Sequence, residues 1–224
     1  MRLKLHQFRP RTGPHEHRVV QPLTALRHTS LREPDRYGML MGDHDGLNRL
    51  AGLFSFAAYS RHTIVHVPLR DSVPPDEGRG ELVDLVLAHH ALGLRPSAWP
   101  QLRRKLVHGT PLTVRTDEAR TAHDAASWQR RRHHNDLRDL IRHTSHARTL
   151  FLFGSRDVFA DAASSFAYAA GWGPRQKRVV QGHSAVVSAI DGLMPDGDDL
   201  RRGFEVAICF KPYPPYAHFS RPGR

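Results

Sequence analysis

One pattern occurs twice in this chain: a short apolar run, a glycine turn and a segment with helical spacing follow one another. The first copy spans residues 37–59, with Gly42 at the turn, and the second spans residues 149–170, with Gly154 at the turn. In both helical segments apolar residues recur three and four positions apart, which predicts amphipathic helices. A strand that turns directly into a helix is typical of α/β proteins, so this pattern restricts the fold more than any other feature.

The two segments align when Gly42 is placed over Gly154. Further positions then coincide: Asp45 with Asp157, Ala51 with Ala163, Phe54 with Phe166, and Ala57 and Ala58 with Ala169 and Ala170. An internal repeat would give such a match. Convergence on similar helices, rich in Phe and Ala, would also give it, and both explanations stay open.

The remaining sequence predicts further elements. A β-branched strand at 62–69 completes a βαβ unit with the first segment, which we expect to cross over right-handed. Residues 1–35, broken by prolines, read as a wrapping segment with at most a short strand at 17–21. We expect helices at 81–92, 96–107 and 127–146, strands at 112–115, 178–181 and 204–210, and a strand or short helix at 184–193.

Together these elements predict an α/β fold with a mixed, largely parallel sheet and helices on both faces; whether it consists of two pseudo-equivalent βα halves is left open. We expect a single domain over residues 1–224. Its candidate halves, 36–95 and 148–210, would be joined by a basic helical segment at 96–147, and an extended tail would occupy 211–224.

The cysteine content and the apolar runs indicate the compartment. Cys209 is the only cysteine, so an intrachain disulfide and a zinc site of paired thiolates are excluded. The first ten residues lack the apolar stretch of a signal peptide, and no apolar run approaches the roughly 20 residues of a membrane span. We therefore expect a soluble, cytoplasmic protein that does not use a membrane.

Positive charge is concentrated in the middle of the chain. The formal net charge is +11, and residues 95–148 contain twelve Lys or Arg against five Asp or Glu. Such a charge attracts nucleic acid and other polyanions. The abundance of Arg together with Ala, Gly, Pro and His is also what a GC-rich genome produces, so this second explanation of the charge stays open.

Both glycine turns are candidate ligand sites, because ligands of open α/β sheets bind beyond the carboxyl ends of strands, where helix N–H groups point outward. Gly154, Ser155 and Arg156 combine helix amides with a hydroxyl and a guanidinium, which suits a phosphate or carboxylate. Neither turn matches the dinucleotide fingerprint or the P-loop, so the cofactor stays unknown.

The Gly42 turn has different chemistry, because Asp43 and Asp45 place carboxylates, and His44 an imidazole, at the helix start. These groups suit general acid or base work, and with Asp157 they form the best catalytic set if the two turns face each other. Plain helix capping by Asp and Ser is the alternative at both turns.

On the predicted helix at 127–146, Arg131, Arg138 and Arg142 share one stripe, opposite an apolar face. Such a stripe resembles a surface that contacts phosphate backbones; a solvated helix face is the alternative. No histidine pair has the His-Glu-x-x-His spacing of a helical metal site, and we expect no metal.

These features support one leading hypothesis and two alternatives. The leading hypothesis is a protein that binds a phosphate-bearing ligand, with nucleic acid or a nucleotide favoured, between the Gly42 and Gly154 turns. The alternatives are a small-molecule enzyme that uses Asp43 or Asp45 as acid or base, and an interaction subunit without catalysis, either a homo-oligomer or bound to a partner protein. Whether the protein is an enzyme is left open.

Overall fold

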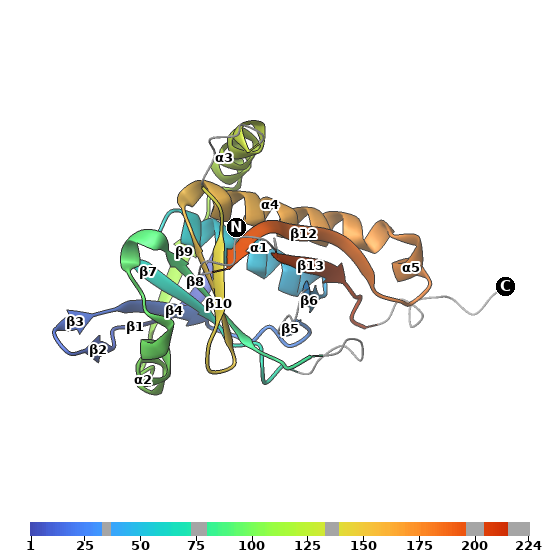
Figure 1. Ribbon diagram of the computed structural model, residues 1–224. Coiled ribbons are helices and arrows are strands. Elements are labelled where there is room, and N and C mark those ends of the chain that lie inside the picture. Colours follow the sequence, from blue (N-terminus) through green and yellow to red (C-terminus); the bar gives the residue numbers. More distant parts are fainter. Residues whose placement is uncertain (33–36, 73–79, 133–138, 196–203, 215–224) are drawn as a thin grey trace.

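The computed structural model describes residues 1–32, 37–72, 80–132, 139–195 and 204–214. Within these residues the chain forms one large mixed sheet with helices packed against it (Figure 1). The order of the strands is β5-β6-β13-β12-β10-β11-β8-β7-β4-β1-β9, and a short separate hairpin, β2 with β3, projects from one end.

The helices are α1 (His44–Ala58), α2 (Trp99–Arg104), α3 (Glu118–Arg131), α4 (Arg156–Trp172) and α5 (Lys177–Val180). The strands are β1 (Arg2–Phe8), β2 (Arg11–Thr12), β3 (His15–Glu16), β4 (Arg18–Pro22), β5 (Ser30–Arg32), β6 (Tyr37–Gly42), β7 (Thr63–Val67), β8 (Asp84–His89), β9 (Thr110–Arg115), β10 (Arg142–Ser145), β11 (Thr149–Gly154), β12 (Ala185–Pro195) and β13 (Phe204–Phe210).

Two groups of four strands share one pattern of pairing. In β5-β6-β13-β12 and in β10-β11-β8-β7 the outer pairs are antiparallel and the middle pair is parallel. The long helices connect the groups, because α1 follows β6 and leads to β7, whereas α4 follows β11 and leads to β12. The interpretation as two pseudo-equivalent halves is not confirmed and stays a prediction.

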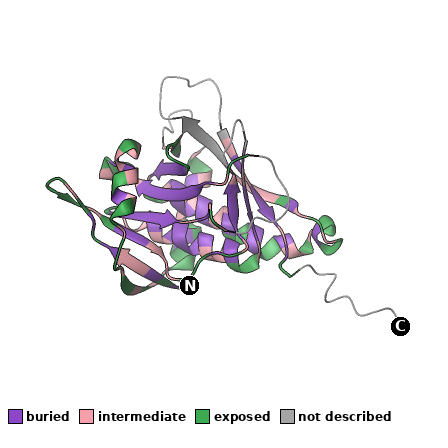
Figure 2. Ribbon diagram, turned by 90° about the horizontal axis from the view of Figure 1, so that it is seen from below, coloured by how far each residue is buried: buried purple, intermediate pink, exposed green. Residues whose placement is uncertain are grey.

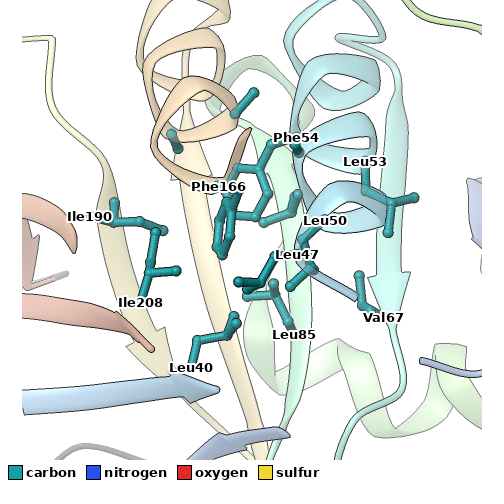
Figure 3. Close-up of a cluster of buried hydrophobic side chains, with 14 of the residues drawn as sticks. Leu40, Leu47, Leu50, Leu53, Phe54, Val67, Leu85, Phe166, Ile190 and Ile208 are labelled. Atoms are coloured by element: carbon teal, nitrogen blue, oxygen red, sulfur yellow. The ribbon is translucent and has the colours of Figure 1, made fainter. Parts of the chain in front are cut away.

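The core lies where α1 packs against α4 on one face of the sheet. The ring of Phe54 contacts Phe166 at a centroid distance of 4.9 Å and Phe159 at 6.1 Å. Figure 3 shows Leu47 and Leu50 of α1 beside these rings, together with side chains from strands of both groups. The same cluster joins both groups of strands, so the two helices hold the sheet together.

The opposite face of the sheet carries a smaller core. There Trp99 and Leu102 of α2 cover Val86 of β8 and Phe151 of β11. The three long helices α1, α3 and α4 lie on the other side, as Figure 1 shows. The expected arrangement of helices on both faces is therefore not confirmed, since among the described residues only the short α2 and adjacent 3-10 turns lie on the second face. The central strands β7, β8 and β11 are buried along nearly their whole length, and Figure 2 shows buried strands in the middle of the molecule.

The expectation of a largely parallel sheet is wrong. Among the described neighbours, six strand pairs are antiparallel and four are parallel. The predicted βαβ unit does not form either, because β7 pairs with β4 and β8 rather than with β6. The cause is tertiary: α1 carries the chain from one group of strands to the other.

Within residues 81–92, Asp84–His89 form the strand β8 and His90–Leu92 form a 3-10 turn, in place of the predicted helix. Leu85 and Leu87 face the α1 core while Val86 and Ala88 face Trp99. A strand buried on both faces has no polar alternation, so its apolar run resembles a buried helix.

Three other predictions are also corrected. The helix expected at 127–146 ends at Arg131, and Arg142 begins the strand β10; residues 133–138 lie outside the described part. The strand expected at 178–181 is the short helix α5. The N-terminal wrapping segment contains β1, a full strand between β4 and β9.

Strands β6, β7, β9, β11 and β13 and helices α1 and α4 are confirmed, and 184–193 is a strand. No helix in the described residues is both long and apolar enough to cross a membrane.

The α1–α4 contact predicts a large loss of stability for Phe54→Ala. The ring is fully buried, and removing such a ring typically costs about 3–5 kcal/mol. Urea denaturation of both proteins measures the change. Phe56→Ala is the matched control, because Phe56 is only partly buried on the same helix; an equal loss for the two variants would contradict the role given to Phe54.

Candidate functional site

The Gly154 corner is the surface where β8 and β11 end side by side and α4 begins. The two strands are parallel, and Gly154 is in register with His89. A hollow of about 520 Å³ lies at this corner. Its lining comes from α1 and the loop after it, from β8, from the segment before β10 and from the start of α4 with its cap: Ala58, Tyr59, Arg61, His89, Asp139, Ser155, Arg156 and Asp157.

Ser155 begins α4 and also holds the edge of the hollow. Its Oγ accepts a hydrogen bond from the backbone N–H of Asp157 at 3.3 Å and donates to Oδ2 of Asp139 at 2.6 Å. Gly154 allows the tight approach of the helix, because a Cβ there would lie 2.7 Å from the side chain of Val158. The predicted helix cap is therefore present, and its hydroxyl is also tied to a carboxylate.

Asp157 holds two arginines at the rim. Oδ2 accepts from Nη2 of Arg131 at 2.6 Å, and Oδ1 accepts from Nε of Arg156 at 2.8 Å. Burial raises the pKa of Asp157, but the hydrogen bonds from the two guanidinium groups outweigh it and leave this pKa below its ordinary value. The carboxylate therefore stays ionised and orients both arginines.

Arg156 keeps most of its donors free. Besides the bond to Asp157, its Nε lies 3.6 Å from Oδ2 of Asp124. Among the described residues, neither terminal nitrogen of Arg156 has a hydrogen-bond partner. A guanidinium held at Nε can still present its two Nη groups to an oxyanion as a fork.

Asp124 of α3 supports the corner from behind. It accepts a hydrogen bond from the hydroxyl of Tyr59 at 2.9 Å. Burial and this bond raise the pKa of Tyr59, so the phenol remains protonated. The guanidinium of Arg120 covers the ring of Tyr59 at 4.5 Å, which fixes the ring at the edge of the hollow.

His89 and Arg61 complete the lining. Nδ1 of His89 accepts from the backbone N–H of Ala91 at 3.3 Å. Burial, together with repulsion from His90 and Arg61, lowers the pKa of His89. Because Nδ1 is an acceptor, the proton of the neutral ring lies on Nε2, which can donate to a ligand. Arg61 is exposed and has no ion pair with any described residue.

The side chains of the Gly42 corner, where β6 ends and α1 begins, already serve local structure. Asp43 caps α1 by accepting from the N–H of Gly46 at 2.8 Å. Nδ1 of His44 donates to the carbonyl of Ala170 at 3.1 Å. Asp45 lies 3.7 Å from Arg49, one helical turn later, and is mostly exposed. These contacts match the capping alternative and favour no catalytic role.

The two corners lie at opposite ends of the helix pair. His44, at the start of α1, contacts Ala170 near the end of α4, whereas Tyr59, just after α1, lies beside Arg156 at the start of α4. The helices are therefore antiparallel, and α1 alone spans roughly 22 Å. This geometry corrects the expectation of one site between the Gly42 and Gly154 turns, and it separates Asp157 from Asp43 and Asp45.

The predicted arginine stripe does not form on one helix. Arg131 is on α3 and bonds Asp157. Arg142 begins β10 opposite Phe153, so it lies at the same edge of the sheet but faces the α2 side. Arg138 lies outside the described residues. The structure thus brings together Gly154, Ser155, Arg156, Asp157 and Arg131 from the predicted set.

Sequence reasoning missed Arg61, His89 and Asp139. His89 and His90 directly follow an apolar run, and Arg61 and His62 directly precede another. Strands that end at the edge of a sheet place polar residues directly beside an apolar run, so these pairs could have indicated the strand ends. The prediction of a helix at 81–92 prevented this interpretation. Asp139 belongs to no local pattern in the sequence, so only the tertiary fold shows that it lines the hollow.

A second polar cluster is buried at the other end of β8. Oδ1 of Asp84 accepts from the backbone N–H groups of Leu69 and Arg70 at 3.0 and 3.1 Å. Its Oδ2 lies 3.4 Å from His66, Arg70 and Arg103. Nδ1 of His66 contacts the amide of Gln21 at 2.6 Å. With every polar group of Asp84 engaged, this cluster serves the fold and leaves the Gly154 corner as the candidate site.

No set of three or more His, Cys, Asp or Glu side chains in the described part of the chain is arranged to hold a metal ion. Comparisons with protein-family models, with curated proteins and with solved structures give no match. The functional argument therefore depends on the geometry of the Gly154 corner.

The buried cluster predicts a loss of stability in mild acid. Burial lowers the pKa of His66, so the unfolded chain takes up a proton below about pH 6.5 that the folded ring does not. The free energy of unfolding should fall as the pH drops from about 7.5 to about 5.5.

His66→Gln should make that decline shallower, as measured by urea denaturation at each pH. His62→Gln, at an exposed histidine in the loop before β7, is the control and should follow the wild-type profile. Parallel profiles for the wild type and His66→Gln would show that His66 does not cause the decline.

Proposed function

We propose that this protein binds phosphate groups at the Gly154 corner, and that its ligand is a nucleic acid. The observation that carries the proposal is the state of Arg156: its Nε is held by Asp157, and its terminal nitrogens lack partners among the described residues. A guanidinium held in this way meets a phosphate without losing further side-chain freedom, so binding costs less entropy.

The other donors around the hollow support an anionic ligand. Arg61 carries a positive charge that has no ion pair with a described residue, and His89 offers Nε2–H. The first turn of α4 adds backbone N–H groups and the positive end of a helix dipole. The carboxylate of Asp157 is already neutralised by two arginines, and that of Asp139 accepts from Ser155. Asp139 has no ion pair with a described residue, so its carboxylate is the one negative charge of the lining that the cations Arg61 and Arg156 have to outweigh.

A polymer fits the surroundings of the corner better than a mononucleotide. Arg130 and Arg131 are exposed at the end of α3, beside the hollow, and extend the positive charge along the surface. Neither turn has the glycine pattern that cradles a dinucleotide or a nucleoside triphosphate. Contacts to phosphates alone bind nucleic acid without reading its sequence. A nucleotide is the alternative ligand, and the test below distinguishes it.

The proposal gives the two corners different roles. If β5-β6-β13-β12 and β10-β11-β8-β7 are pseudo-equivalent, Phe210 of β13 takes the place of His89 of β8, since each is in register with a corner glycine. Phe210 packs so tightly on Gly173 that a Cβ there would collide with its ring.

Beside the Gly42 corner, a hollow of about 540 Å³ is lined by His44, Asp45 and Arg49 among others. The donors of Arg49 are already engaged by Asp45 and by the carbonyls of Thr24 and Ala25, so we propose that the Gly154 corner, rather than the Gly42 corner, binds the ligand.

Arg156→Gln and Arg61→Gln should each weaken binding of an oligonucleotide and reduce the slope of log K against log salt by about 1. Fluorescence anisotropy across a salt series measures both quantities. Arg61 makes no ion pair among the described residues, so its variant should fold normally. Arg104→Gln removes an exposed positive charge from α2 on the opposite face of the sheet and should leave the slope close to that of the wild type.

A flat salt dependence, or no binding at low salt, would exclude nucleic acid. Saturable binding of a nucleoside triphosphate that excludes the oligonucleotide, and that is lost in Arg156→Gln, would assign a nucleotide to the corner. Equal slopes for all three variants would place the binding surface elsewhere on the protein.

A further inference from the structure

The outward face of α4 is covered along its first half only. There α3 packs beside it, with Gln129 donating to Asp161 at 2.5 Å. Beyond this point the outward positions are Tyr168 and Trp172, which are 54% and 42% exposed. Figure 1 shows α3 near the start of α4 and α5 beyond its end. Large aromatic rings thus lie on a helix face that no described element covers.

These exposed rings are ordered as a stack. The rings of Tyr168 and Trp172 are nearly parallel, with an angle of 17° between their planes and 6.5 Å between their centroids. The guanidinium of Arg175 lies over the ring of Trp172 at 5.5 Å. Three flat groups therefore follow one another along the end of α4, and we call Tyr168, Trp172 and Arg175 the aromatic stack.

The segment of the chain that carries the aromatic stack has charged residues of one sign. Residues 162–190 contain no Asp or Glu, and they contain Arg175, Lys177 and Arg178. All three cations are exposed. A surface that binds a neutral protein needs no such excess of positive charge. A surface that binds a polyanion with flat apolar groups needs both the positive charge and the exposed aromatic rings.

We propose that the aromatic stack binds the bases of single-stranded nucleic acid, while Arg175, Lys177 and Arg178 contact its phosphates. The inference depends on the proposed function for the class of ligand and adds that the strand is unpaired. Aromatic rings beside a positively charged surface bind single strands because every base has a face that can stack. In a duplex those faces are covered by neighbouring bases, so the stack would find no partner.

The position of the aromatic stack agrees with one ligand that also reaches the Gly154 corner. Both features belong to α4, one at its start and one at its end, and the helix spans roughly 25 Å. Because α3 covers the outward face of the first half of α4, a single strand that meets both has to pass beside α3. The first contact would bind phosphate and the second would bind bases.

Trp172 provides a direct signal for the test. The other tryptophans, Trp99 and Trp128, are 0% and 4% exposed. Because Trp128 donates to the carbonyl of Asp139 at the Gly154 corner, the variant Trp172→Phe is needed to assign a change in emission to Trp172. Titration of the full-length protein with a short oligothymidylate at low salt should quench this emission. The duplex of the same length should quench it much less, and Trp172→Phe should remove the signal while it retains binding.

The double variant Tyr168→Ala, Trp172→Ala should bind the oligothymidylate about 10-fold or more weakly, with little change for the duplex. The variant Tyr168→Phe, Trp172→Phe keeps both rings and should restore affinity. If the alanine variant is unstable, the quenching of the wild-type protein by single strand and by duplex decides the question alone.

The outcomes separate this inference from the proposed function. Binding of single strand and duplex with equal affinity, unchanged emission and no effect of the alanine variant would overturn the stack and leave the Gly154 corner intact. Quenching that persists in Arg156→Gln, with unchanged affinity for the oligothymidylate, would support the aromatic stack and exclude the Gly154 corner as a binding site. Quenching by polyglutamate but not by any nucleic acid would assign the surface to an acidic protein and overturn the inference, and no binding of any nucleic acid would overturn both.

Discussion

The antiparallel packing of α1 against α4 is the contact on which the rest of the structure depends. Each helix is the connection that carries the chain from one group of strands to the other, so the groups share a single core at the place where the helices touch. Phe54 fills that place between Phe159 and Phe166. Rings at an interior contact also remove a large apolar area from water, which makes such a contact a large part of the stability of a domain.

The same packing determines the surroundings of the Gly42 and Gly154 corners, the two expected ligand sites. Antiparallel helices present their starts at opposite ends, so two corners with similar sequences face different surroundings. At one corner, β13 places the apolar Phe210 beside Gly42. At the other, β8 places His89 beside Gly154, and Arg131 and Asp124 of α3 contact residues that line the hollow. The two corners therefore differ in their neighbours as well as in their turn residues.

Helix α4 then joins the two proposed binding features. Its first turn supports the arginines that Asp157 holds, and its last turn carries Tyr168 and Trp172. A rigid helix keeps a phosphate contact and a base contact at a constant separation, which favours a ligand with a regular repeat of phosphates and bases. The core that holds α4 against α1 is thus also what keeps these two surfaces in register.

The sequence by itself determined the local elements whose signals are local. The apolar runs before Gly42 and Gly154, the helices after them and the caps at Asp43 and Ser155 follow from spacing and turn chemistry, and the structure contains them. Only the tertiary structure decided which strands are neighbours, that β8 is a strand buried on both faces, and that the two turns lie apart. The physical reason is that pairing and burial depend on contacts between residues far apart in the chain. Arg61, His89, Asp139 and Arg156 come from four separate segments, and no short-range pattern records that they line one hollow.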